Sequence, residues 1–137
     1  MPFDEDLQTG KKWEHIIANC LNKGAFPKAK VVDGKHYYDI VDDETGIRWE
    51  VKYDAMSQGT DNVCIEIGTK EIPKGLSRTI ATYWVHIWFD NDQLVCNTIH
   101  VLNFRKLVKN NRKKITIRYN VGDGNSTICL IPKALFK

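Results

Sequence analysis

The chain has 137 residues, 42% of them hydrophobic and 27% charged, which is an ordinary composition for a globular protein and the length of one domain, 1–137. No stretch approaches the ~20 apolar residues of a membrane-spanning helix, and the polar, acidic start is unlike a signal peptide, so we expect a cytoplasmic protein, in a host's cytoplasm if its source is viral. The net charge of +3 is compatible with a nucleic-acid partner without requiring one.

Residues 7–22 are predicted to form a helix, because apolar residues recur along them at helical spacing. Asp4, Asp6 or Thr9 would cap its start, since their side-chain oxygens suit the free N–H groups there. Glu14 lies just off the apolar stripe, where it is either a surface residue or part of a site.

Two short strands, 37–41 and 47–54, are predicted to form a hairpin around a polar turn. The second strand alternates strictly, which places Glu50 and Lys52 on the same face. In such a hairpin Asp39 would lie beside Glu50, with Lys52 two residues further along.

Two interpretations of this charged face are open. Alternating charged residues on a strand are most often simply solvated. Asp39, however, stands among apolar neighbours, and an unpaired buried charge is costly, so that a metal ion with Glu50 and Lys52 would compensate it. Magnesium is often held by one or two carboxylates, and a lysine can orient or activate the attacking water. The face therefore predicts a hydrolytic magnesium site.

A third strand is predicted at 62–67, with Glu66 as a second acid in an apolar strand. If this strand continues a meander, Asp39, Glu50 and Glu66 converge on one face. Glu66 is then either a ligand of the metal or water, or a partner of Lys52 or of a buried serine.

The polar segment 68–82 follows the third strand and contains a turn and a short helical stretch. We expect it beside the acidic face, where its polar residues are either phosphate contacts or ordinary surface residues. The candidates for phosphate contact are Lys70, Lys74, Ser77, Arg78 and Thr79.

Residues 83–89 are nearly all apolar or aromatic, which predicts a central strand buried on both faces, with His86 as a core histidine. A return strand at 93–98, a helix over 101–111 and a final hairpin of 114–121 with 126–132 follow.

The predicted helix over 101–111 ends in the densest positive cluster of the chain. Cations favour a helix C-terminus, so this cluster either stabilises the helix or binds a DNA backbone. The candidate DNA contacts are Lys109, Arg112, Lys113 and Lys114.

The four cysteines are far apart and stand among apolar neighbours. We expect Cys20, Cys64, Cys96 and Cys129 to be buried free thiols, and their spacing does not support a zinc site.

Asp39, followed after the turn by Glu50-Val51-Lys52, resembles the motif of the PD-(D/E)xK nuclease superfamily. Tyr38 stands where that superfamily often has proline. The resemblance implies a core of a helix, a three-stranded meander and a further strand, and it covers roughly residues 7–90.

The same resemblance implies roles for individual residues. Asp39 and Glu50 would bind Mg²⁺ or Mn²⁺ with the Val51 carbonyl as a further ligand, and Lys52 would orient or activate the water. Gly10 with Glu14 resembles the helix of archaeal-type Holliday-junction resolvases, in which a glutamate completes the metal site.

The predicted fold is therefore α/β (α+β), with a restriction-endonuclease-like core, an N-terminal helix, a meander in a mixed central sheet, and a C-terminal helix and hairpin. The predicted function is metal-dependent hydrolysis of duplex or branched DNA, as in resolvases and phage or homing endonucleases, with a homodimer by analogy. The alternative is a nucleic-acid-binding or interaction module without catalysis.

Overall fold

The computed structural model describes residues 2–32, 38–69, 73–122 and 125–136, and the side chains within these ranges from residue 9 onward. The elements in chain order are α1 (Pro2–Lys23), β1 (Ala29–Val31), β2 (Ile40–Asp42), β3 (Arg48–Tyr53), β4 (Asn62–Thr69), η1 (Gly75–Ser77), β5 (Tyr83–Asp90), β6 (Gln93–His100), α2 (Val101–Asn110), η2 (Arg112–Lys114), β7 (Thr116–Val121), β8 (Ser126–Pro132) and η3 (Lys133–Phe136). No helix in these ranges is long and apolar enough to cross a membrane.

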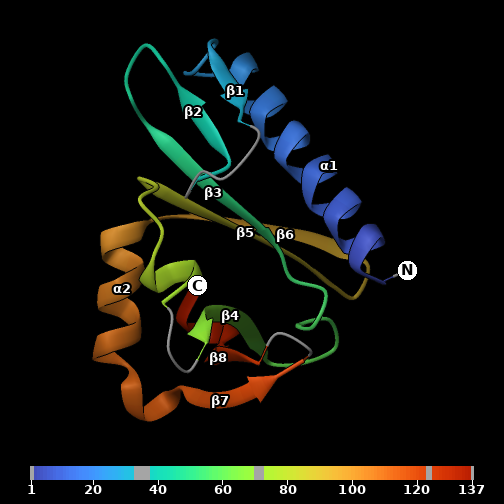
Figure 1. Ribbon diagram of the computed structural model, residues 1–137, viewed down its shortest axis with the longest axis vertical. Helices are drawn as coiled ribbons and strands as arrows, with labels where there is room; N and C mark the ends of the chain where they lie inside the picture. The colour runs from blue at the N-terminus through green and yellow to red at the C-terminus, as the bar shows by residue number, and fades with distance from the viewer. Residues whose placement is uncertain (1, 33–37, 70–72, 123–124, 137) are drawn as a thin grey trace.

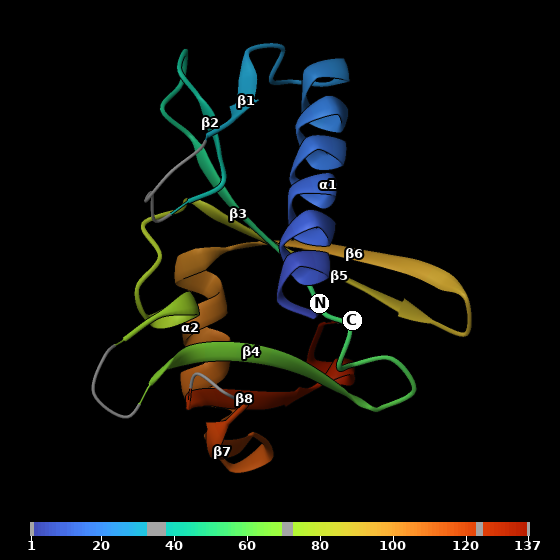
Figure 2. The same cartoon turned by 45° about the vertical axis from the view of Figure 1, so that its right-hand side comes forward.

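The protein has an α+β fold built on two sheets. A mixed sheet has the strand order β1-β2-β3-β5-β6, in which β3 and β5 are parallel and the other neighbours antiparallel. A smaller antiparallel sheet has the order β4-β8-β7. Helix α1 covers one face of the mixed sheet, and α2 and the smaller sheet lie on the other side (Figure 1, Figure 2).

Helix α1 packs on the mixed sheet through the apolar stripe that its sequence predicts. Trp13 and Ile17 contact a cluster that includes the buried residues Trp49 and Val51 of β3. The Trp13 ring also stacks on Tyr53, with 5.7 Å between ring centroids. These contacts place α1, and with it Glu14, over the C-terminal half of β3.

Strand β5 is buried on both faces, as its apolar sequence predicts. Val85 faces the α1 side, whereas Trp84 and Trp88 face the second core, with Phe104 of α2 and Ile65 of β4. Because β5 takes part in both clusters, it joins the two layers of the fold.

The hairpin of β2 and β3 is confirmed, with Ile40 opposite Trp49, but the strand predicted at 37–41 begins only at Ile40, so Tyr38 and Asp39 precede it. The helix start is different from the prediction. Helix α1 begins at Pro2, so Asp4, Asp6 and Thr9 lie inside it and do not cap it. Proline is favoured in the first turn of a helix, and early acids suit the positive helix end, so the helix extends further than the apolar stripe indicates.

The predicted meander of three acid-bearing strands is wrong in its third member. The strand at 62–67 forms as β4, but β4 pairs with β8 in the smaller sheet. Strand β3 already has β5 as its parallel neighbour, from Trp49 opposite Tyr83 onward, so it has no edge left there for β4. The meander of the mixed sheet is instead β1-β2-β3.

The cysteine prediction is correct in part. All four are free thiols, but Cys20 and Cys96 are exposed, Cys64 is half-buried and Cys129 is buried. Apolar neighbours in sequence predict burial only when they point to the same side, and in a strand adjacent residues point to opposite faces.

Candidate active site

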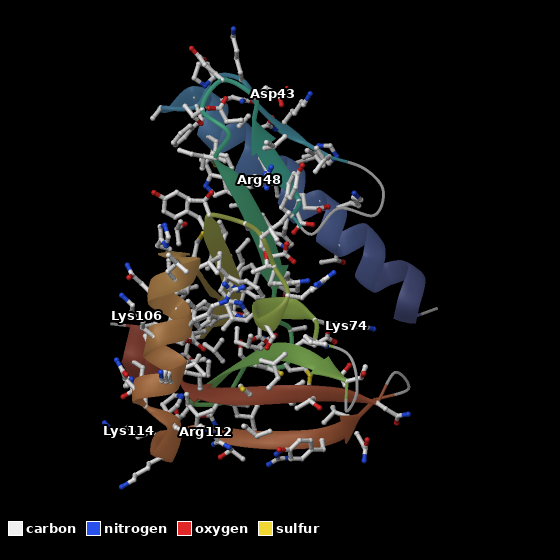
Figure 3. All side chains as sticks on the ribbon, turned by 60° about the vertical axis from the view of Figure 1, so that its left-hand side comes forward. Asp43, Arg48, Lys74, Lys106, Arg112 and Lys114 are labelled. Carbon is white, nitrogen blue, oxygen red and sulfur yellow. The ribbon has the colours of Figure 1, made fainter. Side chains whose placement is uncertain are left out.

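The ladder between β2 and β3 stops at Asp39. The Asp39 N–H donates to the Trp49 carbonyl at 2.9 Å, but the next donor of β3, the Val51 N–H, donates to Asp39 Oδ2 at 2.8 Å. A carboxylate oxygen thus replaces the strand carbonyl that would continue the ladder. The Arg48 guanidinium lies 4.7 Å from the ring centre of Tyr38 and holds this segment against β3 (Figure 3 labels Arg48).

Val51 presents both of its backbone polar groups to this edge. In a strand the N–H and C=O of one residue point to the same side, so the Val51 carbonyl faces the edge at which its N–H contacts Asp39. This placement agrees with the predicted role of the Val51 carbonyl beside the Asp39 carboxylate.

Glu14 reaches Asp39 from helix α1. Its residue is only 6% exposed, and a side-chain hydrogen bond links it to Asp39. Burial, this hydrogen bond and the charge of Asp39 raise the pKa of Glu14 to about 7, although Lys11, 3.5 Å from its carboxylate, acts in the opposite direction. The interpretation of Glu14 as a surface glutamate is therefore wrong.

Glu50 approaches Asp39 from β3. It is 9% exposed, and the Lys52 Nζ lies 3.2 Å from its Oε1. Burial and the negative charge of Asp39 raise the pKa of Glu50 to about 7, against the opposing effect of Lys52. A solvated strand face does not bury a glutamate in this way, so that interpretation of Glu50 is wrong.

Lys52 is the cation of the cluster. Partial burial lowers the pKa of its ammonium group, but the charges of Glu50, Asp39 and Glu66 raise it by more, so that its pKa lies above the ordinary value. About half of its side chain is covered, and the group carries a positive charge at neutral pH.

Asp39 is the centre of this arrangement, because it bonds to Glu14 and its charge acts on both Glu50 and Lys52. The sequence-predicted residues Asp39, Glu50, Lys52 and Glu14 therefore lie together. With pKa values of about 7, the carboxyls of Glu14 and Glu50 hold protons until the pH is near neutral, and a bound cation would displace them.

The donor set suits a hard divalent cation. Asp39 and Glu50 offer carboxylate oxygens, and Mg²⁺ is often held by one or two carboxylates together with water. Among the residues that the structure describes, no group of three or more His, Cys, Asp and Glu side chains is arranged as a ready metal site. Two carboxylates, the Val51 carbonyl and water are thus the ligands that this edge offers.

Glu66 does not lie with the other acids on the mixed sheet. It belongs to β4 of the smaller sheet, is exposed and accepts a hydrogen bond from Ser126 Oγ at 2.8 Å. Its charge still acts on Lys52. Of its predicted roles, the structure therefore supports that of a partner of Lys52 and of a serine, although Ser126 is half-buried and not buried.

A second, buried polar cluster lies two residues beyond Lys52. Asp54 Oδ2 accepts from His86 Nε2 at 2.9 Å and from the Cys64 N–H at 2.7 Å. The Trp84 indole N–H donates to His86 Nδ1 at 3.0 Å, and because an indole can only donate, the proton of His86 is on Nε2. His86 is therefore a core histidine with both ring nitrogens hydrogen-bonded, as predicted. The role of Asp54 in this cluster was not predicted.

The predicted phosphate contacts of the loop after β4 differ in accessibility. Lys74, Ser77 and Arg78 are exposed, and Figure 3 labels Lys74. Thr79 is buried, its hydroxyl accepts from the Ala81 N–H at 3.1 Å, and it is therefore unsuited to contact phosphate. Lys70 lies outside the described residues.

The basic cluster after α2 is exposed as predicted. All four predicted contacts are exposed, namely Lys109, Arg112, Lys113 and Lys114. Figure 3 shows Arg112 and Lys114 at the end of α2. Arg105, one turn earlier, instead donates to the carbonyls of Leu76 and Thr79, which ties the loop after β4 to α2.

Comparison of the chain with protein-family models, with curated proteins and with solved structures finds no match. The chemical interpretation of the site therefore depends on its own geometry and on the motif.

Proposed function

We propose that this protein is a metal-dependent nuclease that hydrolyses DNA phosphodiester bonds, with a site of the PD-(D/E)xK kind. The observation that carries the proposal is the gathering of Asp39, Glu50 and Lys52, with Glu14 bonded to Asp39, at the edge where β2 leaves β3. Three ionisable groups with shifted pKa values, gathered around Asp39, are typical of a catalytic site.

The arrangement of the strands supports the same proposal. The superfamily core consists of a helix, a three-stranded meander and a further strand. Here α1 is followed by the meander β1-β2-β3, and β5 then pairs parallel to β3. Asp39 directly precedes β2 and Glu50 lies in β3, so one acid stands at the start of the second strand of that meander and the other on its third strand.

Each residue of the cluster has a defined task in this proposal. Asp39 and Glu50 hold the ion with the Val51 carbonyl, and Glu14 fixes the Asp39 carboxylate. A bound Mg²⁺ or Mn²⁺ supplies Lewis acidity and lowers the pKa of its water. Lys52, whose pKa is above its ordinary value, donates hydrogen bonds to the attacking water or to phosphate oxygens and offsets their growing charge.

Exposed cations on both sides of the second core would contact the DNA backbone. Lys74 and Arg78 lie in the loop after β4, and Lys109, Lys113 and Lys114 lie at the end of α2. Contacts of this kind give affinity that depends on salt and carry no sequence information.

Plasmid nicking tests the proposal. Supercoiled plasmid is incubated with wild-type protein and Mg²⁺, Mn²⁺ or EDTA, and with the variants Asp39→Asn and Lys52→Ala. Loss of a preorganised charge or hydrogen-bond donor typically costs 10²–10³ in rate, so both variants should lose at least roughly 100-fold. Glu44→Gln, an exposed glutamate of the β2–β3 turn, is the matched control and should cleave like wild type.

Equal nicking by wild type, Asp39→Asn and Lys52→Ala would identify a contaminating nuclease and reject the site. If the protein binds DNA in EDTA but does not nick it with either Mg²⁺ or Mn²⁺, the result favours the alternative, a nucleic-acid-binding module without catalysis. Circular dichroism of each variant checks that the fold is retained.

A further inference from the structure

A pocket of about 340 Å³ lies between α2, the loop after β4 and the smaller sheet. Its walls are aliphatic and include Ile67, Val108 and Ile117, with the buried Leu76 and Ile115 beneath them. Its size and apolar lining are those of a site for a small organic group. None of the cluster residues around Asp39 lines it.

The polar part of the pocket is at its rim. Ser77 and Arg112 are exposed lining residues on opposite elements, η1 and η2. Arg112 lines the pocket, and its guanidinium donates to the carbonyl of Ile115, another lining residue, at 3.5 Å. A ligand with an apolar body and an adjacent negative charge fits this combination.

The surroundings of the pocket favour a polyanion as the source of that ligand. Residues 101–137 contain nine Lys or Arg and only one acid, an Asp. Residues 1–100 contain eleven Lys or Arg and sixteen Asp or Glu. The exposed Lys109, Lys113 and Lys114 flank Arg112 in sequence. A nucleotide within a DNA chain brings a base as the apolar body and a phosphate beside it, with further phosphates for the neighbouring lysines.

We infer that this pocket binds one unpaired nucleotide of the DNA substrate, with its base between the aliphatic walls and its phosphate at Arg112. This inference rests on the proposed function and narrows the substrate to DNA with an unpaired nucleotide, such as a bulge, a branch or a single strand. Because the walls offer few hydrogen-bonding groups, all four bases should be accepted.

The pocket is linked to Lys52 of the cluster through Glu66. Leu76 lines the pocket, and the preceding residue Gly75 is pressed so closely against the Glu66 backbone that a side chain would collide with it. The charge of Glu66 in turn acts on Lys52. A nucleotide in the pocket would therefore lie beside the loop that packs on the strand of Glu66.

DNA binding without metal tests the inference. Fluorescence anisotropy in EDTA compares a labelled duplex with the same duplex carrying one unpaired nucleotide. Burial of an unpaired base between the aliphatic walls is expected to give a preference of at least roughly tenfold for the bulged duplex, since a gain of about 1.4 kcal/mol is tenfold in affinity. The assay needs no cleavage, so a lack of nicking would reject the proposed function while leaving this preference measurable.

Variants of the pocket assign the preference to it. Val108→Trp fills the cavity and Ser77→Phe narrows its mouth from an exposed position, and each should abolish the preference while duplex affinity stays within about twofold. Leu94→Trp, at an exposed position of β6, is the control and should keep the preference. If Val108→Trp fails to fold, Ser77→Phe still tests the pocket, because its substitution is at an exposed position.

Three results would overturn the inference. The first is equal binding of both duplexes by wild type, and the second is a preference that both pocket variants keep. The third is that decanoate raises the melting temperature of wild type but not of Val108→Trp, while both proteins bind the bulged duplex with the same affinity. The last result would assign the pocket to an anionic amphiphile in place of a nucleotide.

Discussion

Glu50→Gln is expected to stabilise the metal-free protein, and to do so only above acidic pH. Glutamine resembles the protonated glutamic acid in shape and charge. In the wild type, burial and the charge of Asp39 raise the pKa of Glu50 from 4.5 to about 7. Ionising this carboxyl in the native state therefore costs more than ionising it in the unfolded chain.

The pH window follows from these two pKa values. Below 4.5 the carboxyl is protonated in both states, so it contributes no difference. Between 4.5 and about 7 the native state holds more protons than the unfolded state, and wild-type stability falls as the pH rises. Above 7 the full cost is present, and the shift from 4.5 to about 7 corresponds to about 3 kcal/mol at 1.36 kcal/mol per pKa unit.

The loss of the Glu50–Lys52 ion pair changes this figure little, because half-exposed pairs contribute at most about 1 kcal/mol and the opposing effect of Lys52 is already contained in the pKa of Glu50. For a domain of this length, about 3 kcal/mol corresponds to a rise in melting temperature of roughly 10 °C.

Urea denaturation in EDTA at about pH 5 and about pH 8 measures the effect. The variant should exceed the wild type by about 3 kcal/mol at the higher pH and by less than about 1 kcal/mol at the lower. Glu44→Gln, in the exposed turn, should change stability by less than about 0.5 kcal/mol at both. An equal difference between Glu50→Gln and wild type at the two pH values would refute the reasoning, because it would show that the carboxyl does not titrate against the fold.

Three further outcomes are expected. Above neutral pH, Mg²⁺ should raise the melting temperature of the wild type through binding to the native state. Asp39→Asn, whose side chain can still accept from the Val51 N–H, should stay folded and lose this rise. Calorimetric binding of Mg²⁺ to the variant at wild-type affinity would contradict the site. Gly75→Ala should destabilise the protein by more than about 2 kcal/mol in urea melts, since Gly75 has φ +53° and a side chain there collides with the β4 backbone; an unchanged midpoint would argue against the close approach of loop and strand. Charge reversal of Lys113 and Lys114 should lower the slope of log affinity against log salt by nearly one per lost phosphate contact, and an unchanged slope would assign these lysines to stability of the helix end alone.

The local part of the site was predictable from sequence. A short turn fixes the register of a hairpin, so the alternation of β3 was enough to place Asp39 beside Glu50, and the structure has the pair Ile40 and Trp49 next to them. The interpretation as a metal site depended on Asp39 standing among apolar residues, a signal that also lies within one short segment.

The parts that failed depend on contacts between distant segments. Strand β4 pairs with β8, for example Asn62 with Pro132, and nothing in the alternation of β4 distinguishes that neighbour from β3. The burial of Glu14 likewise depends on how α1 lies over β3, because its position just off the apolar stripe fits both a surface and a site residue. Thr79 was misassigned because its burial comes from the packing of its loop against α2.

Two aspartates, one on each side of Lys52, accept hydrogen bonds from backbone N–H groups near β3. Just before β2 begins, Asp39 accepts from the Val51 N–H. Where the chain turns away towards β4, Asp54 accepts from the N–H groups of Ser57 and Cys64.

The two aspartates differ in what remains available to a ligand. Asp54 is 6% exposed and accepts from two backbone donors and from His86, so a cation there would have to displace three hydrogen bonds in a closed core. Asp39 is half-buried, accepts from one backbone donor, and otherwise faces Glu14 and Glu50, whose pKa values are raised first by burial and then by Asp39. Of the two aspartates, Asp39 is therefore the one beside which we propose that a divalent ion binds, and we place the proposed catalytic centre there.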